Sequence, residues 1–272
     1  MSDPLSDYEF LDAGDGRRLE RFGGVIVDRP APGAIDRPRL DGRRWRRAHA
    51  MFDRATGWQW SAPPPDPWLY RVDDLVLELR PADGGQVGVF PEHAAMWPWL
   101  ADRSTDGGVL DLFAYTGATT LALAASGTPV THVDAARTAV VWARSNAERS
   151  GLGGSPVRWI VDDAAAFVGR ERRRGKRYAG IVLDPPTYGH GGGTRRWSVD
   201  RDLEPLLESC AAIVARSGFV LLTSHTPEYG PARLERMLET AIGPGAASGY
   251  LELHARSGVR LRLGAYARWA GT

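Results

Sequence analysis

The sequence is poor in cysteine and contains no long apolar run. Cys210 is the single cysteine among 272 residues, which excludes a disulfide framework and fits a reducing compartment. No stretch is apolar over the length that a transmembrane helix needs, and the N-terminus has no signal-peptide pattern. We therefore expect a cytoplasmic protein without membrane association.

The chain also lacks a charge excess of either sign. Its 34 basic and 33 acidic residues give a net charge of +1, so local clusters are more informative than the total. The most compact cationic group flanks Trp45, and we call it the arginine cluster. It consists of Arg43, Arg44, Arg46 and Arg47. This cluster is either a solvated face or a surface that contacts phosphates, and both interpretations stay open.

The stretch from Val109 to Asp134 has the pattern of half a nucleotide-binding unit. An apolar strand at Val109–Leu112 leads into a turn at 114–117 and a helix of small residues at 118–126. A second strand then ends at Asp134. Open backbone N–H groups at such a turn suit a polar ligand, and the acid after the second strand suits a ribose diol. Any parallel α/β unit with an acidic strand end would look similar.

Strands and helices continue to alternate after this unit. The pattern predicts helices at 92–100, 136–150, 164–174, 200–215 and 231–241, strands at 157–161, 179–183 and 219–223, and a closing hairpin at 250–267. Residues 1–83 differ, with short strands around an Asp15-Gly16 turn and proline-rich loops. We expect an α/β fold: a Rossmann-like doubly wound sheet with a C-terminal antiparallel hairpin at 84–272, preceded by a small β-rich N-terminal cap at 1–83.

Four carboxylates follow successive predicted strands, namely Asp111, Asp134, Asp163 and Asp184. Ligands of open α/β sheets bind at the carboxyl ends of the strands, so these acids should share one edge. Each could instead cap the helix that follows it.

The segment Asp184-Pro185-Pro186-Thr187-Tyr188 is the most specific local signal. Two prolines fix the backbone where the strand ends, so we expect Tyr188 to be held rigidly over the cleft. A simple proline turn is the alternative.

Together, LDLFAYTG, VDAARTAVVWARSNAERSGL, VDDAAAF and IVLDPPTYG resemble class I S-adenosylmethionine (SAM)-dependent methyltransferases. The chain is most similar to the bacterial ribosomal-RNA (large subunit) methyltransferase-like branch. The segment GQVGVFPEHAAMW also resembles the lead-in to the cofactor domain of that branch. The resemblance covers about residues 84–225 well and the remainder more loosely. It implies SAM as the cofactor, an RNA partner and no metal.

The resemblance also implies roles for individual residues. Asp134 would hold the ribose of SAM, and Asp163 the adenine amino group. The methionine part would be wrapped by Phe113, Tyr115 and Gly117, with Asp111 near its ammonium. The expected catalytic corner consists of Asp184, Pro185, Pro186 and Tyr188. The acceptor would meet Tyr188, Arg195 and Arg196.

The departures from related 5-methylcytosine enzymes narrow the chemistry. Those enzymes need a cysteine nucleophile, whereas the matching strand end here reads LLTSHT. Cys210 falls instead in an apolar helical stripe and should be a small buried hydrophobe. We therefore predict direct in-line transfer to a nitrogen of an RNA base, ribosomal RNA above all. His225 could accept a proton or be structural, and the glycines around His190 suggest a mobile loop over the acceptor.

Other functions stay open at this stage. The acceptor could be a protein or a small molecule. An NAD-dependent oxidoreductase shares the strand–turn–acid logic, but its turn should read G-x-G-x-x-G, and FAYTGATT does not. A non-catalytic nucleotide-binding module would have no need for the DPPTY corner. The oligomeric state is not predicted.

Overall fold

The computed structural model describes residues 6–103, 107–189 and 196–271. The chain forms two compact units: unit 1 is Met1–Glu92 with Glu252–Leu263, and unit 2 is His93–Leu251 with Gly264–Thr272. Unit 1 thus continues past the predicted boundary at residue 83 and includes the tip of the C-terminal hairpin. Leu253 and Leu261 of this tip are buried with Phe10, which is why the tip belongs to unit 1.

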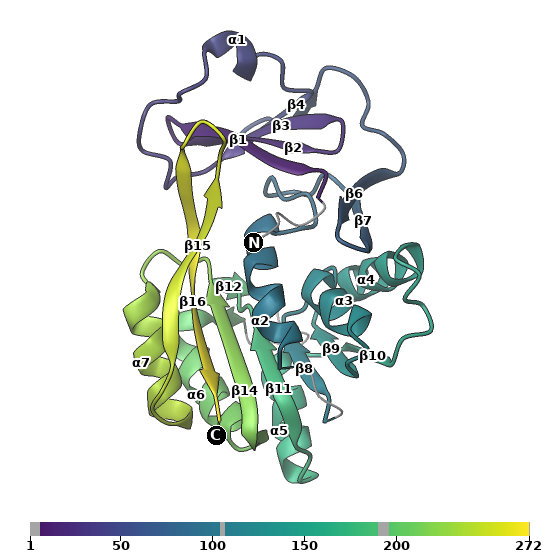
Figure 1. The fold of residues 1–272 in the computed structure, drawn as a ribbon, viewed down its shortest axis with the longest axis vertical. Helices are drawn as coiled ribbons and strands as arrows, with labels where there is room; N and C mark the ends of the chain where they lie inside the picture. Colours follow the sequence, from purple (N-terminus) through teal and green to yellow (C-terminus); the bar gives the residue numbers. More distant parts are fainter. Residues whose placement is uncertain (1–5, 104–106, 190–195, 272) are drawn as a thin grey trace. The chain divides into compact units, whose positions relative to one another are not determined.

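Unit 2 is built on a seven-stranded sheet in the order β10-β9-β8-β11-β14-β16-β15 (Figure 1). Its strands are β8 (Val109–Leu112), β9 (Val130–Asp134), β10 (Val157–Val161), β11 (Tyr178–Leu183), β14 (Val214–Ser224), β15 (Ala247–His254) and β16 (Arg260–Ala270). The neighbouring pairs from β10 to β14 are parallel, and β16 runs antiparallel to β14. The predicted Rossmann-like sheet with its closing hairpin is confirmed.

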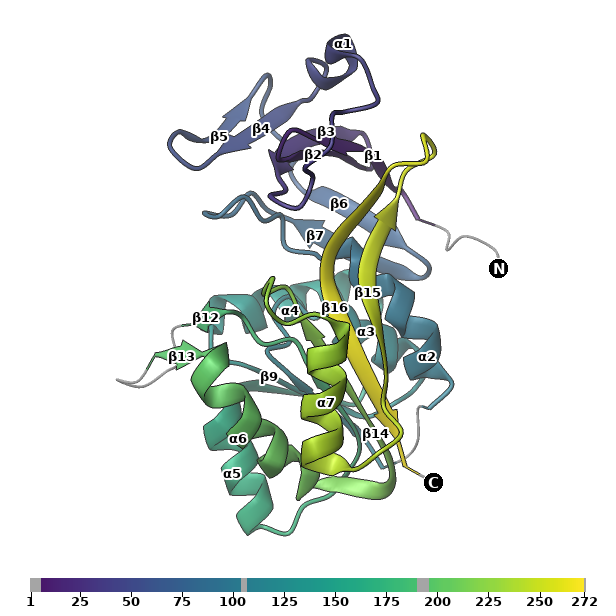
Figure 2. The same ribbon diagram turned by 90° about the vertical axis from the view of Figure 1, so that its left-hand side faces the viewer.

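Helices cover both faces of this sheet (Figure 2). They are η1 (Pro91–Met96, a 3₁₀ helix), α2 (Trp97–Ala101), α3 (Ala118–Ala125), α4 (Arg137–Arg149), α5 (Ala164–Arg173), α6 (Val199–Ala211) and α7 (Pro231–Ile242). Alternate strand residues point to opposite faces. Leu110 and Ile181 pack with α5, α6 and α7, whereas Val109 and Val182 pack with α2 and α3. Among the described residues, no helix has the length and apolar character needed to cross a bilayer.

Two predicted helices differ from the structure. The helix expected at 200–215 ends at Ala211, and the chain turns through an Ile213 N–H to Cys210 C=O hydrogen bond of 2.9 Å before β14 begins at Val214. A register shift in the pairing of β14 with β11 absorbs the residues between Val214 and Phe219. The helix expected at 92–100 is split into η1 and α2, with a proline in the first turn of α2.

Unit 1 is β-rich, as the composition of its first segment predicts. Its strands are β1 (Tyr8–Gly14), β2 (Arg17–Phe22), β3 (Val25–Pro30), β4 (Ala50–Asp53), β5 (Gly57–Trp60), β6 (Trp68–Val72) and β7 (Leu75–Leu79). It also contains the short helix α1 (Gly42–Trp45). β1 to β5 form one sheet, and β6 pairs with β7. Phe22 packs edge to face against Trp68 and Tyr70, which gives the unit an aromatic core.

Candidate active site

The loop between β8 and α3 is tightly wound. Phe113 and Tyr115 have φ angles of 57° and 49°, in the left-handed region that residues with a Cβ seldom adopt. Gly117 has φ 86°, and a Cβ placed there would lie 3.0 Å from the Cβ of Ala143. Such strain persists only where the surroundings enforce it, and it concentrates at ligand sites.

Asp134, at the end of β9, enforces this loop conformation. Its Oδ2 accepts the N–H of Tyr115 at 2.9 Å, and its Oδ1 accepts the N–H of Ala136 at 2.8 Å. Burial raises the pKa of Asp134, although these two hydrogen bonds act to lower it. Each carboxylate oxygen has a second lone pair, so the side chain can still accept two hydroxyl groups.

The expectation of open N–H groups at this turn is wrong for three residues. The N–H of Tyr115 is bound by Asp134, as above, and that of Ala114 donates to Val133 C=O at 3.2 Å. The N–H of Gly117 donates to Ala114 C=O at 3.0 Å. These three donors are therefore used within the fold, one by the turn itself and two by residues of β9.

Asp111 lies in β8 within a buried polar chain. Thr120 donates its hydroxyl to Asp111 Oδ2 at 2.5 Å and lies 2.9 Å from Nδ1 of His132. Burial raises the pKa of Asp111 to about 7, and the charges of Asp184 and Asp134 add to this shift against the Thr120 hydrogen bond. Burial lowers the pKa of His132 to about 3. Near neutral pH this group of buried polar side chains therefore carries little charge. A cation bound beside Asp111 would favour its ionised form.

A cleft of about 800 Å³ opens beside the ends of β9 and β10. Its lining includes Ala135, Asp162, Asp163, Trp197 and Arg201. Asp163 also caps α5, because its Oδ1 accepts the N–H of Ala166 at 2.9 Å. Asp163 therefore caps a helix, as the alternative interpretation predicts. It also lines the cleft, so its predicted contact with the adenine of SAM stays a prediction. The size is within the range of small-molecule sites.

Sequence reasoning missed Trp197 and Arg201 in this lining. Trp197 belongs to a short strand, β13 (Trp197–Ser198), that pairs with β12 (Tyr188–Gly189), and no periodic pattern marks strands this short. Arg196 also lines the cleft, beside Asp162 and Asp163. Arg195 and His190 lie outside the described residues.

The corner after β11 is fixed by hydrogen bonds from neighbouring elements. Thr223 of β14 donates its hydroxyl to Asp184 Oδ1 at 2.6 Å, and the indole N–H of Trp197 donates to the carbonyl of Pro186 at 2.7 Å. Pro185 is buried. Tyr188 is 74% exposed, and its rigid placement over the cleft stays a prediction. Its role toward an acceptor stays a prediction.

Two histidines converge on Asp184, and sequence reasoning found only one of them. His225 follows β14, and His93 lies in η1, 132 residues earlier. Their Nε2 atoms are 3.1 Å apart, and each lies 3.8 Å from a carboxylate oxygen of Asp184. Within the described ranges this is the one trio of such side chains spaced closely enough for a metal ion. A hydrogen bond between the two Nε2 atoms accounts for the pair without a metal.

The cysteine lies apart from this site. Cys210 of α6 is fully buried in the core, and burial raises its pKa to about 12. Because the thiolate is the nucleophilic form, this side chain is inert toward an acceptor base. The prediction of a buried, structural cysteine is confirmed.

Comparisons with known proteins agree with this geometry. A crystal structure of a SAM-dependent methyltransferase from Agrobacterium tumefaciens superposes with a TM-score of 0.93 and is 31% identical, covering 100% of this chain and 92% of that one. A structure from Streptococcus mutans, described as a SAM-dependent methyltransferase, has a TM-score of 0.77 at 18% identity, covering 97% of this chain and 75% of that one. The second likeness shows the fold alone.

Curated relatives match by sequence over part of their length. The ribosomal RNA large subunit methyltransferase K/L of Shewanella frigidimarina is 26% identical over 144 residues, which cover 52% of this chain and 20% of that protein. The protein of the same name from Methylococcus capsulatus is 29% identical over 157 residues, 57% of this chain and 20% of that protein. The chain thus spans about a fifth of the length of these relatives. No family model matches it.

The sheet order, the strained loop after β8 and the acids at the strand ends define a class I methyltransferase fold. With 31% identity over nearly the whole of the Agrobacterium enzyme, this chain belongs to the SAM-dependent methyltransferases. It is an enzyme, and its cofactor is SAM.

Proposed function

We propose that the enzyme methylates a nitrogen of a base in RNA, ribosomal RNA above all, by direct transfer. The observation that carries this proposal is the Asp184 corner, where the carboxylate accepts the hydroxyl of Thr223 from a strand end, LLTSHT, that contains no cysteine. The curated relatives, which are ribosomal RNA methyltransferases by name, support the choice of RNA. An unpaired or extruded base is required, because stacking in a duplex hides the acceptor atoms.

The residues around the strained loop fit SAM. When bound, SAM supplies a methyl group activated by a positive sulfonium. Asp134 offers two free lone-pair directions to the ribose hydroxyls, and the cleft beside Asp163 is large enough for the adenosine part. Asp111 would ionise near the ammonium, while Phe113, Tyr115 and Gly117 would shape the methionine end.

Replacing Asp134 by alanine should weaken SAM binding by about 2–3 kcal/mol, since both ribose hydrogen bonds are charge-assisted and the loop loses its anchor. Isothermal titration calorimetry measures this. Asp15→Ala, at an exposed hairpin turn of unit 1, is the matched control. Unchanged SAM affinity in a folded Asp134 variant would remove the residue from the cofactor site.

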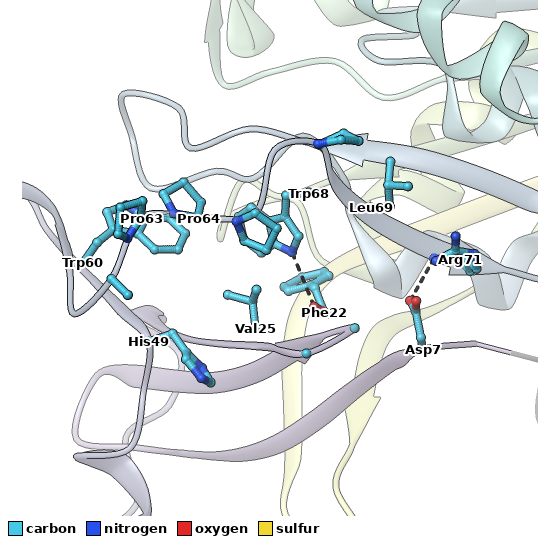
Figure 3. A pocket seen from close by; sticks show the side chains of 15 residues that line it. Asp7, Phe22, Val25, His49, Trp60, Pro63, Pro64, Trp68, Leu69 and Arg71 are labelled. Atoms are coloured by element: carbon cyan, nitrogen blue, oxygen red, sulfur yellow. Dashed lines mark hydrogen bonds between the residues drawn. The ribbon is translucent and has the colours of Figure 1, made fainter.

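Unit 1 offers two features suited to RNA. All four members of the arginine cluster are exposed, while Trp45 donates its indole N–H to the buried Asp12 at 3.1 Å and so anchors the cluster to β1. A separate pocket of about 460 Å³ is lined by tryptophans and prolines (Figure 3). In it, the rings of Trp60 and Trp68 meet edge to face with centroids 5.7 Å apart. Cations and aromatic surfaces are the usual means of holding single strands.

Removing the arginine cluster should weaken RNA binding and reduce the slope of log affinity against log salt by up to about 3, if all four side chains contact phosphates. SAM affinity should not change. The control neutralises Arg172, Arg173 and Lys176, exposed cations after and at the end of α5. An unchanged slope in the cluster variant, measured by fluorescence anisotropy, would show that the cluster is a solvated face.

The decisive experiment on the acceptor is mass spectrometry of ribosomal RNA nucleosides from cells with and without the gene. We expect one N-methylated nucleoside to disappear and to return when purified enzyme and SAM are added to the RNA. Failure of both, with methyl transfer to a protein or small molecule, would overturn the RNA acceptor while leaving the enzyme class intact.

A further inference from the structure

The group formed by His93, His225 and Asp184 lies wholly within unit 2 and comes from three segments far apart in the sequence. His93 lies in η1, Asp184 directly follows β11, and His225 directly follows β14. The carboxylate is only 22% exposed and is oriented by Thr223. We call this group the histidine–aspartate cluster.

The 3.1 Å separation of the two Nε2 atoms determines how this cluster can handle protons. A hydrogen bond along that line needs one Nε2 to carry a proton and the other to offer its lone pair. A further proton taken up by the pair ends that hydrogen bond, because both Nε2 atoms then carry a proton. Each N–H can instead donate toward Asp184, since each Nε2 lies 3.8 Å from one of its oxygens. The cluster is therefore built to receive one proton beside the predicted acceptor position.

We propose that the histidine–aspartate cluster takes up the proton released by the acceptor, which makes that acceptor an N–H group such as an exocyclic amine. This inference rests on the proposed function. The nitrogen lone pair forms the N–C bond to the methyl group as the C–S bond breaks, and the sulfonium becomes a neutral thioether. The positive charge then lies on the methylated N–H group, which passes its proton to Asp184 and on to the histidine pair. A ring nitrogen without hydrogen would need no such receiver.

The two histidines act through Asp184 and are positioning residues for the proton. A metal ion would need lone pairs from both Nε2 atoms at once, whereas their hydrogen bond uses one of them for a proton. The 3.1 Å spacing therefore favours a proton receiver over a metal site.

Other charged groups bear on any pH dependence of the cluster. Asp184 and the Thr223 hydroxyl face it directly, and the buried Asp111 is electrostatically coupled to Asp184. Since the pKa of Asp111 is about 7, the wild-type profile alone would mix the two effects. The difference between wild type and histidine variants isolates the cluster.

The test compares His93→Gln, His225→Gln and the double variant with His254→Gln, a control at an exposed histidine of unit 1. Glutamine keeps a hydrogen-bonding group but does not take up a proton. On ribosomal RNA from cells lacking the gene, we expect kcat to fall at least tenfold in the double variant, with KM and SAM affinity unchanged. The pH dependence of the rate should differ between wild type and the double variant, because glutamine takes up no proton. Added imidazole should restore activity to His225→Gly.

Several outcomes overturn the proposal. One is a double variant whose kcat and pH profile equal those of wild type. Another is a methyl group found on a ring nitrogen that carries no hydrogen. The third is stoichiometric Zn²⁺ binding that activates wild type and is lost in the variants. If wild type transfers no methyl group to RNA, the proposed function fails instead. The hydrogen bond between the two histidines can then still be tested by ¹⁵N NMR. Replacing His93 should shift the Nε2 resonance of His225, and an unchanged resonance would contradict the hydrogen-bonded pair.

Discussion

Asp111→Asn is expected to stabilise the cofactor-free enzyme near neutral pH, by an amount that grows between pH 4 and pH 7. Burial raises the pKa of Asp111 to about 7, above its value in the unfolded chain. The folded state therefore holds a proton that the unfolded state has released, and stability falls as pH rises through this window. The shift corresponds to an upper limit of roughly 4 kcal/mol. Asparagine keeps an acceptor for Thr120 without the ionisation.

Urea unfolding of wild type and variant from pH 4 to pH 8 measures this effect. The difference between the two proteins is the relevant quantity, because burial also lowers the pKa of His132 to about 3. This shift costs stability as pH falls below the unfolded pKa of histidine, which is the opposite pH dependence. SAM affinity should fall in the variant, and proton release on SAM binding by wild type below pH 7 should disappear. A pH-independent stability difference would mean that Asp111 is ionised in the free enzyme.

Gly180→Ala is expected to destabilise unit 2 by about 3 kcal/mol or more. Gly180 lies opposite Phe219 in the parallel pairing of β11 with β14, and an added Cβ would lie within 2.5 Å of three ring carbons of Phe219. The ring cannot move away easily, because it is 2% exposed and packs edge to face on Trp99. The same strand carries Asp184 at its end, so activity should fall with stability.

A double variant, Gly180→Ala with Phe219→Leu, separates a steric clash from a backbone effect. Removing the ring opens the space that the methyl group needs, so the double variant should be more stable than the sum of the two single effects predicts. Additive losses in thermal and urea unfolding would show that the glycine is needed for another reason.

The periodic part of unit 2 could be predicted from the sequence, because its elements are set by local patterns. Val109–Leu112 is buried at all four positions, and a short apolar run bounded by turn residues identifies such a strand. Asp134 stands out as the acid at the end of the next buried strand. The start of β14 at Val214 could not be predicted, since an irregular pairing with β11 overrides the helical pattern there.

The parts of the site that depend on distant contacts escaped the sequence. His93 and His225 meet only because η1 and the end of β14 are brought together by the folded sheet. The inward-pointing N–H groups of the loop after β8 follow from φ angles at Phe113 and Tyr115 that no propensity favours. The hairpin at the C-terminus was predicted, but which core its tip completes depends on side chains more than 200 residues away, such as Phe10.

That hairpin tip has a consequence for the order in which the protein can be finished during synthesis. Residues up to Glu92 are made before the hairpin, yet the core of unit 1 also needs Leu253, Ala255 and Leu261. Until the ribosome has released this late segment, Phe10 and its apolar neighbours lack their partners and are open to aggregation or to chaperones. The N-terminal segment of unit 1 is therefore translated well before its core can be completed.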